Sequence, residues 1–400
     1  MDPRFRALFN RQFSEAIYNR YQRDLSGRLN QQFDFRLAES PVFLPDDFKA
    51  RAVAAATEII EQLSDPGRLE PMRRAIPDRW NTPGMDALPN FAQVDFAVTR
   101  DADGALAPKL IELQGFPSLT ALQVIQRDAW YDVLQSMEGL DRWWSCWYSG
   151  LDREGFLDLA RRTIVGNHDP AEVVLMDIDP PRQKTSTDFT ATKILFDVDA
   201  VDPTSLILRG KDLFRSDGKP VRRIYNRVVF DELIRKNIRL PFDYRKDLNV
   251  EWAPHPNWYW VWSKFSLPFL DHPAVPRATF LSDLDRVPEN LSNYVLKPLF
   301  SFAGGGVNVD PTREAINAVP YAERSGWCLQ EKIEYAPALE APDGSGVKVE
   351  IRMMFLRPDD ESKPILAQNL IRLSRGKMLG VDFNKNFTWV GSSIGLSPGS

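Results

Sequence analysis

The stretch that most restricts the fold of this chain is YVLKPLFSFAGGGVNV, residues 294–309. Two apolar runs flank a lysine–proline pair that begins at Lys297 and three consecutive glycines, Gly304 to Gly306. This pattern predicts two strands joined by a glycine-rich hairpin. A lysine can neutralise phosphate oxygens, and glycines let backbone N–H groups approach them without a Cβ in the way. The stretch therefore has two interpretations, a nucleotide clamp or a flexible loop with a surface lysine.

Composition excludes several classes of function. The net charge is −5 over 400 residues, without a basic block, which argues against nucleic acid or an anionic membrane as partner. No apolar run approaches the ~20 residues that span a bilayer, and the first residues lack a signal segment, so we expect a cytoplasmic protein. Two cysteines and three histidines argue against a disulfide framework or a His/Cys metal centre.

The order of predicted elements indicates an α/β (α+β) protein of more than one unit. Apolar spacing and an acidic start predict a helix over 44–65. From 151 to 250, strands alternate with helices, as in a small parallel sheet. After 277, strands dominate. The predicted strands are 93–98, 109–113, 172–178, 205–210, 222–228, 293–299, 306–310, 326–336, 347–356 and 365–374, and the other predicted helices are 117–137, 151–166 and 186–198.

The strand LIELQ places two oxygen-bearing side chains on one face. Glu112 and Gln114 are two residues apart, and side chains on a strand alternate between faces. Hard oxygen ligands of this kind suit Mg²⁺, which usually bridges to phosphates. Asp95, on the probable partner strand, offers a third carboxylate to the same metal. The alternative is an exposed polar edge of a half-buried strand.

Two later strands carry groups that suit a nucleotide. The strand ending in QEKI can present backbone donors and acceptors to an adenine edge, with Glu331 near the ribose; alone it is an amphipathic strand. Arg352 and Arg372 can stabilise the charge that develops when a phosphoryl group moves, or form simple cross-strand ion pairs. Residues 388–396, TWVGSSIGL, are interpreted as a substrate-contacting lid or a frayed terminus.

Taken in chain order, these pieces resemble the ATP-grasp enzymes, in particular the circularly permuted branch typified by eukaryotic glutathione synthetase, with the glutathionylspermidine synthase type as a neighbour. LIELQGFPSLTALQ is similar to that family's Glu-x-Asn metal strand, YVLKPLFSFAGGGVNV to its Lys-Pro and glycine loop, and LQEKIE to its adenine hinge. RRIYNRV resembles the end of its inserted domain, WVWSKFSL the segment with a second nucleotide lysine, and NLIRLS with TWVGSSIGL its arginine strand and lid. The resemblance spans roughly residues 91 to 396.

The resemblance implies an ATP-grasp fold in permuted order with an inserted small parallel α/β substrate domain. Residues 1–150 would form an N-terminal helical region and the first part of the core, including a metal strand at 107–116. Residues 151–250 would be the inserted substrate-binding domain, and residues 251–400 the nucleotide-binding part and lid.

The resemblance also implies an ATP-dependent carboxylate–amine ligase. ATP, with Mg²⁺, would convert a carboxylate to an acyl phosphate, and an amine would displace the phosphate to leave an amide and ADP. The partners would be small-molecule acid and amine substrates, and a homodimer is an option because related enzymes are often dimers. The residues implied are Lys264, Lys297, Gly304, Gly305, Gly306, Gln330, Glu331 and Ile333 for the nucleotide, Glu112, Gln114 and Asp95 for the metal, Arg372 and Arg352 for catalysis, and Ser118 and Arg227 for the substrate.

Two departures from the family pattern matter. The family carries an acidic metal ligand between Lys-Pro and the glycines, where this chain has LFSFA, and Gln114 replaces the family's asparagine. Asp95 or Asp310 are the candidate substitutes. A first alternative function is therefore a catalytically degenerate ATP-grasp protein that binds nucleotide. A second is a non-enzymatic binding protein whose aromatic segment NWYWVW, 257–262, stacks on a small molecule.

Overall fold

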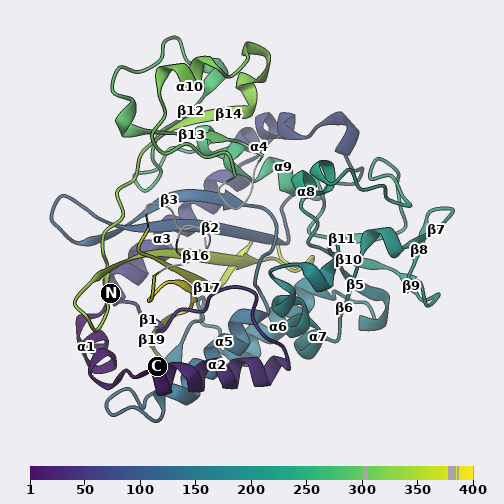
Figure 1. Ribbon diagram of the computed structural model, residues 1–400. Helices are drawn as coiled ribbons and strands as arrows, with labels where there is room; N and C mark the ends of the chain where they lie inside the picture. The colour runs from purple at the N-terminus through teal and green to yellow at the C-terminus, as the bar shows by residue number, and fades with distance from the viewer. Residues whose placement is uncertain (301–304, 377–383, 385–386, 400) are drawn as a thin grey trace.

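The computed structural model describes residues 1–300, 305–376, 384 and 387–399. Its largest element is an antiparallel sheet in the order β18–β17–β16–β2–β3, with β15 beside β16 (Figure 1). We refer to it as the main sheet. Its strands are β2 (Phe91–Arg100), β3 (Leu106–Gln114), β15 (Leu339–Glu340), β16 (Gly346–Leu356), β17 (Ile365–Ser374) and β18 (Gly391–Ser393). The strands predicted at 93–98, 109–113, 347–356 and 365–374 are confirmed.

The main sheet has one apolar and one polar face. Val94, Phe96, Ile351 and Ile371 point to the apolar face and are almost fully buried. The helix α3 (Asp46–Ser64) contacts β3 and β16, and its buried residues recur every three or four positions, as the sequence predicted. The alternate positions of β2, β16 and β17 face the other way and include Asp95, Glu350, Arg352 and Arg372, which leaves charged groups there for function.

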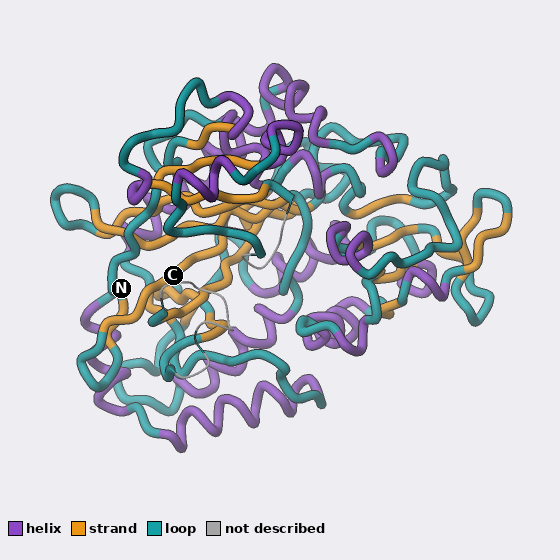
Figure 2. The backbone as a smooth tube through the Cα atoms, turned by 45° about the horizontal axis from the view of Figure 1, so that its top comes forward, coloured by secondary structure: helices purple, strands orange, loops and turns teal. Residues whose placement is uncertain are grey.

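A four-stranded sheet lies to one side of the main sheet in both views (Figures 1 and 2). Its order is β11–β10–β5–β6 and every pairing is parallel, which agrees with the predicted alternation of strands and helices. We call it the parallel sheet. Its strands are β5 (Val173–Met176), β6 (Asp199–Val201), β10 (Arg223–Asn226) and β11 (Glu251–Ala253), and the neighbouring helices are α6 (Arg153–Ile164), α7 (Ser186–Phe196) and α8 (Phe230–Arg235).

The strand predicted at 205–210 does not join the parallel sheet. It forms an antiparallel ribbon of β7 (Ile207–Arg209), β8 (Asp212–Phe214) and β9 (Pro220–Val221). Arg209 pairs with Asp212, so only two residues connect the strands, and Gly210 has a φ of 66°. Such a tight turn reverses the chain, whereas a parallel pairing needs a long crossover.

A three-stranded antiparallel sheet lies beyond β3, at the top of Figure 1. It consists of β12 (Ala278–Phe280), β14 (Trp327–Glu331) and β13 (Tyr294–Pro298), and α10 (Arg313–Asn317) lies beside it. The strand predicted at 306–310 is wrong, because only Asn308 bridges back to Leu296. Gly306 has a φ of 72°, and the Asn308 side chain accepts the N–H of Asp310, so the segment turns away from the sheet.

Strands near the two ends of the chain pair with each other. The short strand β1 (Val42–Phe43) pairs with β19 (Gly395–Pro398), which also pairs with β4 (Trp144–Ser145). The frayed terminus, one of the two alternatives at 388–396, is wrong, since β18 and most of β19 are buried, and contact of this segment with a substrate stays a prediction. The remaining helices are α1 (Pro3–Gln12), α2 (Glu15–Leu29), α4 (Pro66–Met72), α5 (Leu122–Leu134) and α9 (Trp258–Val261). Across the described residues, none of the helices has the length and apolar character to cross a bilayer.

Two local predictions are corrected by the packing. The helix predicted at 117–137 begins only at Leu122, because Leu119 has a φ of 57° and the Asp188 carboxylate accepts the N–H groups of Ala121 and Leu122. The aromatic segment 257–262 is core: Trp258 and Trp262 are fully buried. It therefore offers no surface on which a ligand could stack.

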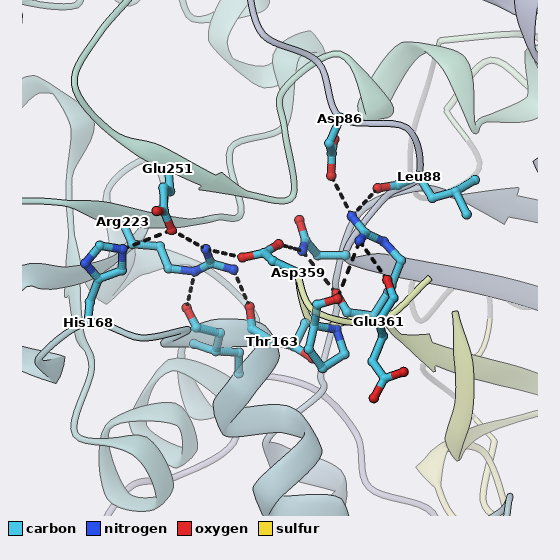
Figure 3. Close-up of polar contacts among 12 residues, drawn as sticks. Asp86, Leu88, Thr163, His168, Arg223, Glu251, Asp359 and Glu361 are labelled. Carbon is cyan, nitrogen blue, oxygen red and sulfur yellow. Dashed lines mark hydrogen bonds and ion pairs between the residues drawn. The ribbon is translucent and has the colours of Figure 1, made fainter. Parts of the chain in front are cut away.

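A buried arginine joins the parallel sheet to the main sheet (Figure 3). The guanidinium of Arg223 donates to Glu251 at 2.8 Å and to Asp359 at 2.7 Å. It also donates to the main-chain oxygens of Ile164 and Thr163, at 3.1 and 2.9 Å. Asp359 lies in the hairpin between β16 and β17, so this cluster fixes the position of the parallel sheet relative to the main sheet.

Candidate functional site

Strand register gathers charged side chains into a row on the polar face of the main sheet. Asp95 on β2 lies opposite both Glu112 on β3 and Arg352 on β16. Glu350 on β16 lies opposite Arg372 on β17. Directly opposed residues on neighbouring strands project from the same face. Five residues that the sequence spreads over 278 positions thus share one surface, which we call the charged row: Asp95, Glu112, Glu350, Arg352 and Arg372.

Asp95 is the centre of the charged row. Arg352 donates from Nε and Nη2 to its two carboxylate oxygens at 2.6 and 2.7 Å, and Arg372 donates to one of the same oxygens. Burial alone would raise the pKa of the Asp95 carboxyl, but the two guanidinium groups hold it below its ordinary value. Both oxygens are therefore engaged by arginines, in the geometry of a bidentate charge-assisted pair.

Glu350 connects the charged row to Tyr335, a residue that the sequence analysis did not single out. Arg372 forms an ion pair with Glu350, and the Tyr335 hydroxyl donates to the other oxygen of Glu350 at 3.0 Å. Burial raises the pKa of Glu350 against the opposing effect of Arg372, and burial raises the pKa of Tyr335 as well. Tyr335 lies near the end of the strand predicted at 326–336, of which only Trp327–Glu331 forms β14, and nothing in its spacing marked it as part of the site.

Two lysines approach the row from the other side. Lys297, on β13, donates from Nζ to the main-chain oxygen of Ile111 at 3.0 Å and to Gln330 Oε1 at 2.6 Å. Lys264, which opens a 3₁₀ turn (Lys264–Phe269), lies 3.7 Å from Glu112. Burial lowers the pKa of Lys297, and its neighbour Lys264 lowers it further. The structure thus brings together the two lysines predicted to hold phosphates.

Gln330 is the one predicted hinge residue whose side chain points at Lys297. It is almost fully buried, and its Nε2 has no hydrogen-bond partner within the described part of the chain. Buried donors without partners are rare in native proteins and often mark a ligand position. Glu331 is exposed and accepts the N–H of Arg277 at 3.1 Å, whereas Ile333 is half-buried just after β14.

The glycine loop follows β13. Gly304 lies outside the described residues, and Gly305 and Gly306 form a turn. A Cβ at Gly306 would lie 3.0 Å from the ring of Pro298, so the loop passes closely over the Lys-Pro pair. The predicted approach of these glycines to phosphate oxygens stays a prediction.

The amide of Gln114 is part of a short hydrogen-bond chain. Its Nε2 donates to Gln93 Oε1 at 2.6 Å, and Gln93 in turn donates to the main-chain oxygen of Ser118 at 3.1 Å. Gln93 was missed by the sequence analysis, although it precedes Asp95 by two positions and so lies on the same face. These two hydrogen bonds hold the turn that contains Ser118 in place.

Arg227 lies apart from the charged row, just after β10 of the parallel sheet. It is buried, and its Nη1 donates to Asp188 at 2.7 Å. Asp188 also receives the N–H groups at the start of α5, so it links Arg227 to the segment that follows Ser118. Sequence reasoning missed Asp188, because an acid inside the predicted helix 186–198 carries no signal for a partner 39 residues later.

The residues predicted to bind magnesium do not form a complete site by themselves. In the described ranges, no group of three or more His, Cys, Asp or Glu side chains is placed to hold a metal ion. Asp95 is held by two arginines, Gln114 uses its amide nitrogen on Gln93, and Glu112 lies beside Lys264. Asp310 forms an ion pair with Lys332 instead. Glu112 would therefore be the main protein carboxylate for a metal ion bound near these residues.

Comparison with known proteins identifies a fold and no family. No protein-family model matches the sequence, and no curated protein matches it. Among solved structures, the chain is similar to a glutathione synthetase-like effector from Globodera pallida in its apo form, with a TM-score of 0.54 and 12% identity. The match covers 97% of this chain and 98% of that chain. The chain therefore has a mixed α/β fold similar to that of a glutathione synthetase-like protein.

Proposed function

We propose that this chain is an ATP-dependent carboxylate–amine ligase of the ATP-grasp type. The observation that carries the proposal is the convergence of Lys264 and Lys297 on the charged row, in a chain whose fold matches a glutathione synthetase-like protein over nearly its full length. Two buried cations facing preorganised arginines suit a polyphosphate better than a neutral ligand.

The nucleotide would lie between β13–β14 and the main sheet. Lys297 would exchange its hydrogen bonds to Ile111 and Gln330 for phosphate oxygens, and the glycine loop would cover them. Gln330 Nε2, which has no partner among the described residues, and the backbone that leads to Ile333 would then face the base. Magnesium would reach this site as the counter-ion of ATP, with Glu112 as the protein carboxylate nearest to it.

The arginines would serve the chemical step. A carboxylate oxygen of the acid substrate attacks the γ-phosphorus and ADP leaves; the amine then attacks the acyl carbon, phosphate leaves, and the amine loses a proton. Arg372, whose side chain is 36% exposed, is the member of the row that can contact the acyl phosphate. Arg352 would hold Asp95, and through it Arg372, in place. Positioning and charge neutralisation are what the chain contributes.

The acid substrate would bind toward the parallel sheet. Buried polar atoms that have no partner in the described part of the chain lie near the carboxyl ends of the parallel strands and near the start of α5. The carboxyl ends of parallel strands are common ligand sites, and unsatisfied buried groups favour a polar ligand. Ser118 and Arg227 would contact it, with Arg227 shared between the ligand and Asp188. The atoms are Gln123 Oε1 and Nε2, Thr187 Oγ1, Arg227 Nε and Gln368 Oε1.

Thermal unfolding with and without Mg-ATP tests the proposal. Ligand at a hundred times its dissociation constant stabilises the native state by about 2.7 kcal/mol, a shift of a few degrees for this size. We expect the wild type and the control Lys211→Met, at an exposed lysine between β7 and β8, to shift, and Lys297→Met to lose the shift. ADP release with candidate acids and amines then tests turnover. A wild type that does not respond to millimolar Mg-ATP would overturn the proposal.

A second function is favoured by one observation. Because Asp95 is fully engaged by arginines, the described part of the chain does not present the complete set of acidic metal ligands expected of an active ligase. A catalytically degenerate protein that binds nucleotide would show the same thermal shift without ADP release. The turnover assay therefore separates the two.

A further inference from the structure

We infer that this chain does not need a divalent cation to bind the phosphates of its nucleotide, because Arg352 and Arg372, anchored by Asp95, supply fixed positive charge at the site. The inference rests on the proposed nucleotide site and goes beyond it. It starts from the disagreement between the ligands that a metal would need and the ones that the site presents.

The carboxylates of the charged row are already neutralised by protein. Asp95 accepts two hydrogen bonds from Arg352 and one from Arg372. Glu350 forms an ion pair with Arg372 and accepts a hydrogen bond from the Tyr335 hydroxyl. Glu112 has the ammonium of Lys264 at 3.7 Å. A dication placed on Asp95 would have to displace charge-assisted hydrogen bonds and lie against two guanidinium groups, which Coulomb repulsion opposes.

The balance of charge also favours an anion over a cation. The charged row and the two lysines present four cationic groups and three carboxylates, so the site is net positive before any metal arrives. Guanidinium groups stay ionised at all physiological pH values, and their planar fork matches phosphate oxygens. Arg352 is held by a bidentate pair, so its charge is fixed in place before the ligand binds.

The sequence is consistent with this arrangement. The segment between Lys297 and the glycines, LFSFA, contains no carboxylate that could complete a metal site from the loop. Arg352 lies opposite Asp95 in the register, where a smaller neutral residue would leave a carboxylate oxygen free for a metal. Within this site, Arg352 therefore keeps one Asp95 oxygen from a metal, while Arg372 engages the other.

Isothermal titration of the full chain with ATP and with its non-hydrolysable imido analogue, in Mg²⁺ and in EDTA, tests the inference. We expect the wild-type dissociation constants in the two buffers to agree within about threefold. Arg352→Gln removes one charge and frees an Asp95 oxygen, so its binding should weaken in EDTA and recover with Mg²⁺. Arg222→Gln, at an exposed arginine of the parallel sheet, is the matched control and should behave as wild type.

Each outcome of the titration decides the matter. Wild-type binding at least about tenfold weaker in EDTA overturns the inference and leaves the proposed nucleotide site standing. Absence of binding in both buffers overturns the inference and the proposed function together. The wild-type comparison alone suffices if Arg352→Gln does not fold, which its thermal unfolding curve would reveal.

Discussion

Arg352 donates two parallel hydrogen bonds, of 2.6 and 2.7 Å, to Asp95. The two residues lie on neighbouring strands, although they are 257 residues apart in the chain. Asp95 is 1% exposed, so this pair has little help from solvent. Breaking one partner of a buried ion pair leaves an uncompensated charge, which costs far more than the pair contributes as a whole.

The first prediction concerns this pair. Asp95→Asn should lower the free energy of unfolding by about 3 to 5 kcal/mol, because Arg352 would keep its charge without its carboxylate. The double variant Asp95→Asn/Arg352→Met removes both charges and should recover part of that loss. Urea unfolding of the wild type, both single variants and the double variant gives the coupling energy. Strictly additive losses would show that the two residues do not act as a pair.

The second prediction concerns Asp177, at the end of β5. Burial raises the pKa of this carboxyl to about 7, despite the opposing charge of Arg227. Between the unfolded pKa near 4 and the folded pKa the native state holds the extra proton, so stability falls as the pH rises through that window. Asp177→Asn should therefore be close to neutral at pH 4 and stabilising at pH 8, by up to about 4 kcal/mol. The exposed Asp103→Asn is the control, and urea unfolding at both pH values gives the difference.

A stabilisation by Asp177→Asn that is the same at pH 4 and pH 8 would contradict this assignment. It would mean that the carboxyl is equally protonated in both states of folding, or that the amide forms a new hydrogen bond that has no relation to charge.

The third prediction concerns Arg223, which links the parallel sheet to the main sheet (Figure 3). Arg223→Met should cost about 3 kcal/mol, since it removes charge-assisted bonds to Glu251 and Asp359 and leaves two main-chain oxygens without their donor. The adjacent Arg222→Met removes only a half-exposed ion pair with Asp212 and should cost less than about 1 kcal/mol. Hydrogen exchange should show faster exchange in β10 and in the β16–β17 hairpin for Arg223→Met alone. If both variants changed hydrogen exchange to the same extent throughout the protein, that result would argue against Arg223 as the residue that links the two sheets.

The fourth prediction concerns Gly115, directly after the strand that carries Glu112 and Gln114. A Cβ there would lie 2.9 Å from both the Trp258 main-chain oxygen and the Trp262 Cβ. Gly115→Ala should cost about 1 to 3 kcal/mol through this overpacking and displace the end of β3. Gly27→Ala, in helix α2 with open space around it, should instead stabilise by about 0.5 to 1 kcal/mol. Thermal unfolding ranks the two variants, and equal effects would show that the Trp segment yields.

The sequence predicted elements well where one periodicity dominated. The alternation in 93–98 and 347–356 and the helical spacing in 44–65 describe β2, β16 and α3, because burial of one face leaves a local pattern. Prediction failed where a distant group decided the outcome. The helix start near Leu122 depends on Asp188, and the burial of 391–398 depends on strands from the other end of the chain.

For the candidate site, the sequence indicated the faces and not the partners. It placed Asp95, Arg352 and Arg372 on polar faces of strands, but the register that joins them is a property of the folded sheet. Tyr335 and Gln93 were missed because their roles consist of hydrogen bonds to Glu350 and Gln114, which have no spacing in the chain. Nucleotide and metal binding remain predictions for the experiments above.

The pairing of β2 with β16 has a consequence for synthesis on the ribosome. The hairpin β2–β3 leaves the exit tunnel tens of seconds before β16 at ribosomal rates on the order of 10 residues per second. During that interval the edge of β2 has no partner, and such edges invite pairing with other chains. Asp95 and Glu112 lie side by side in this hairpin, and charged side chains near an open edge disfavour pairing with a foreign strand until the arginine on β16 arrives.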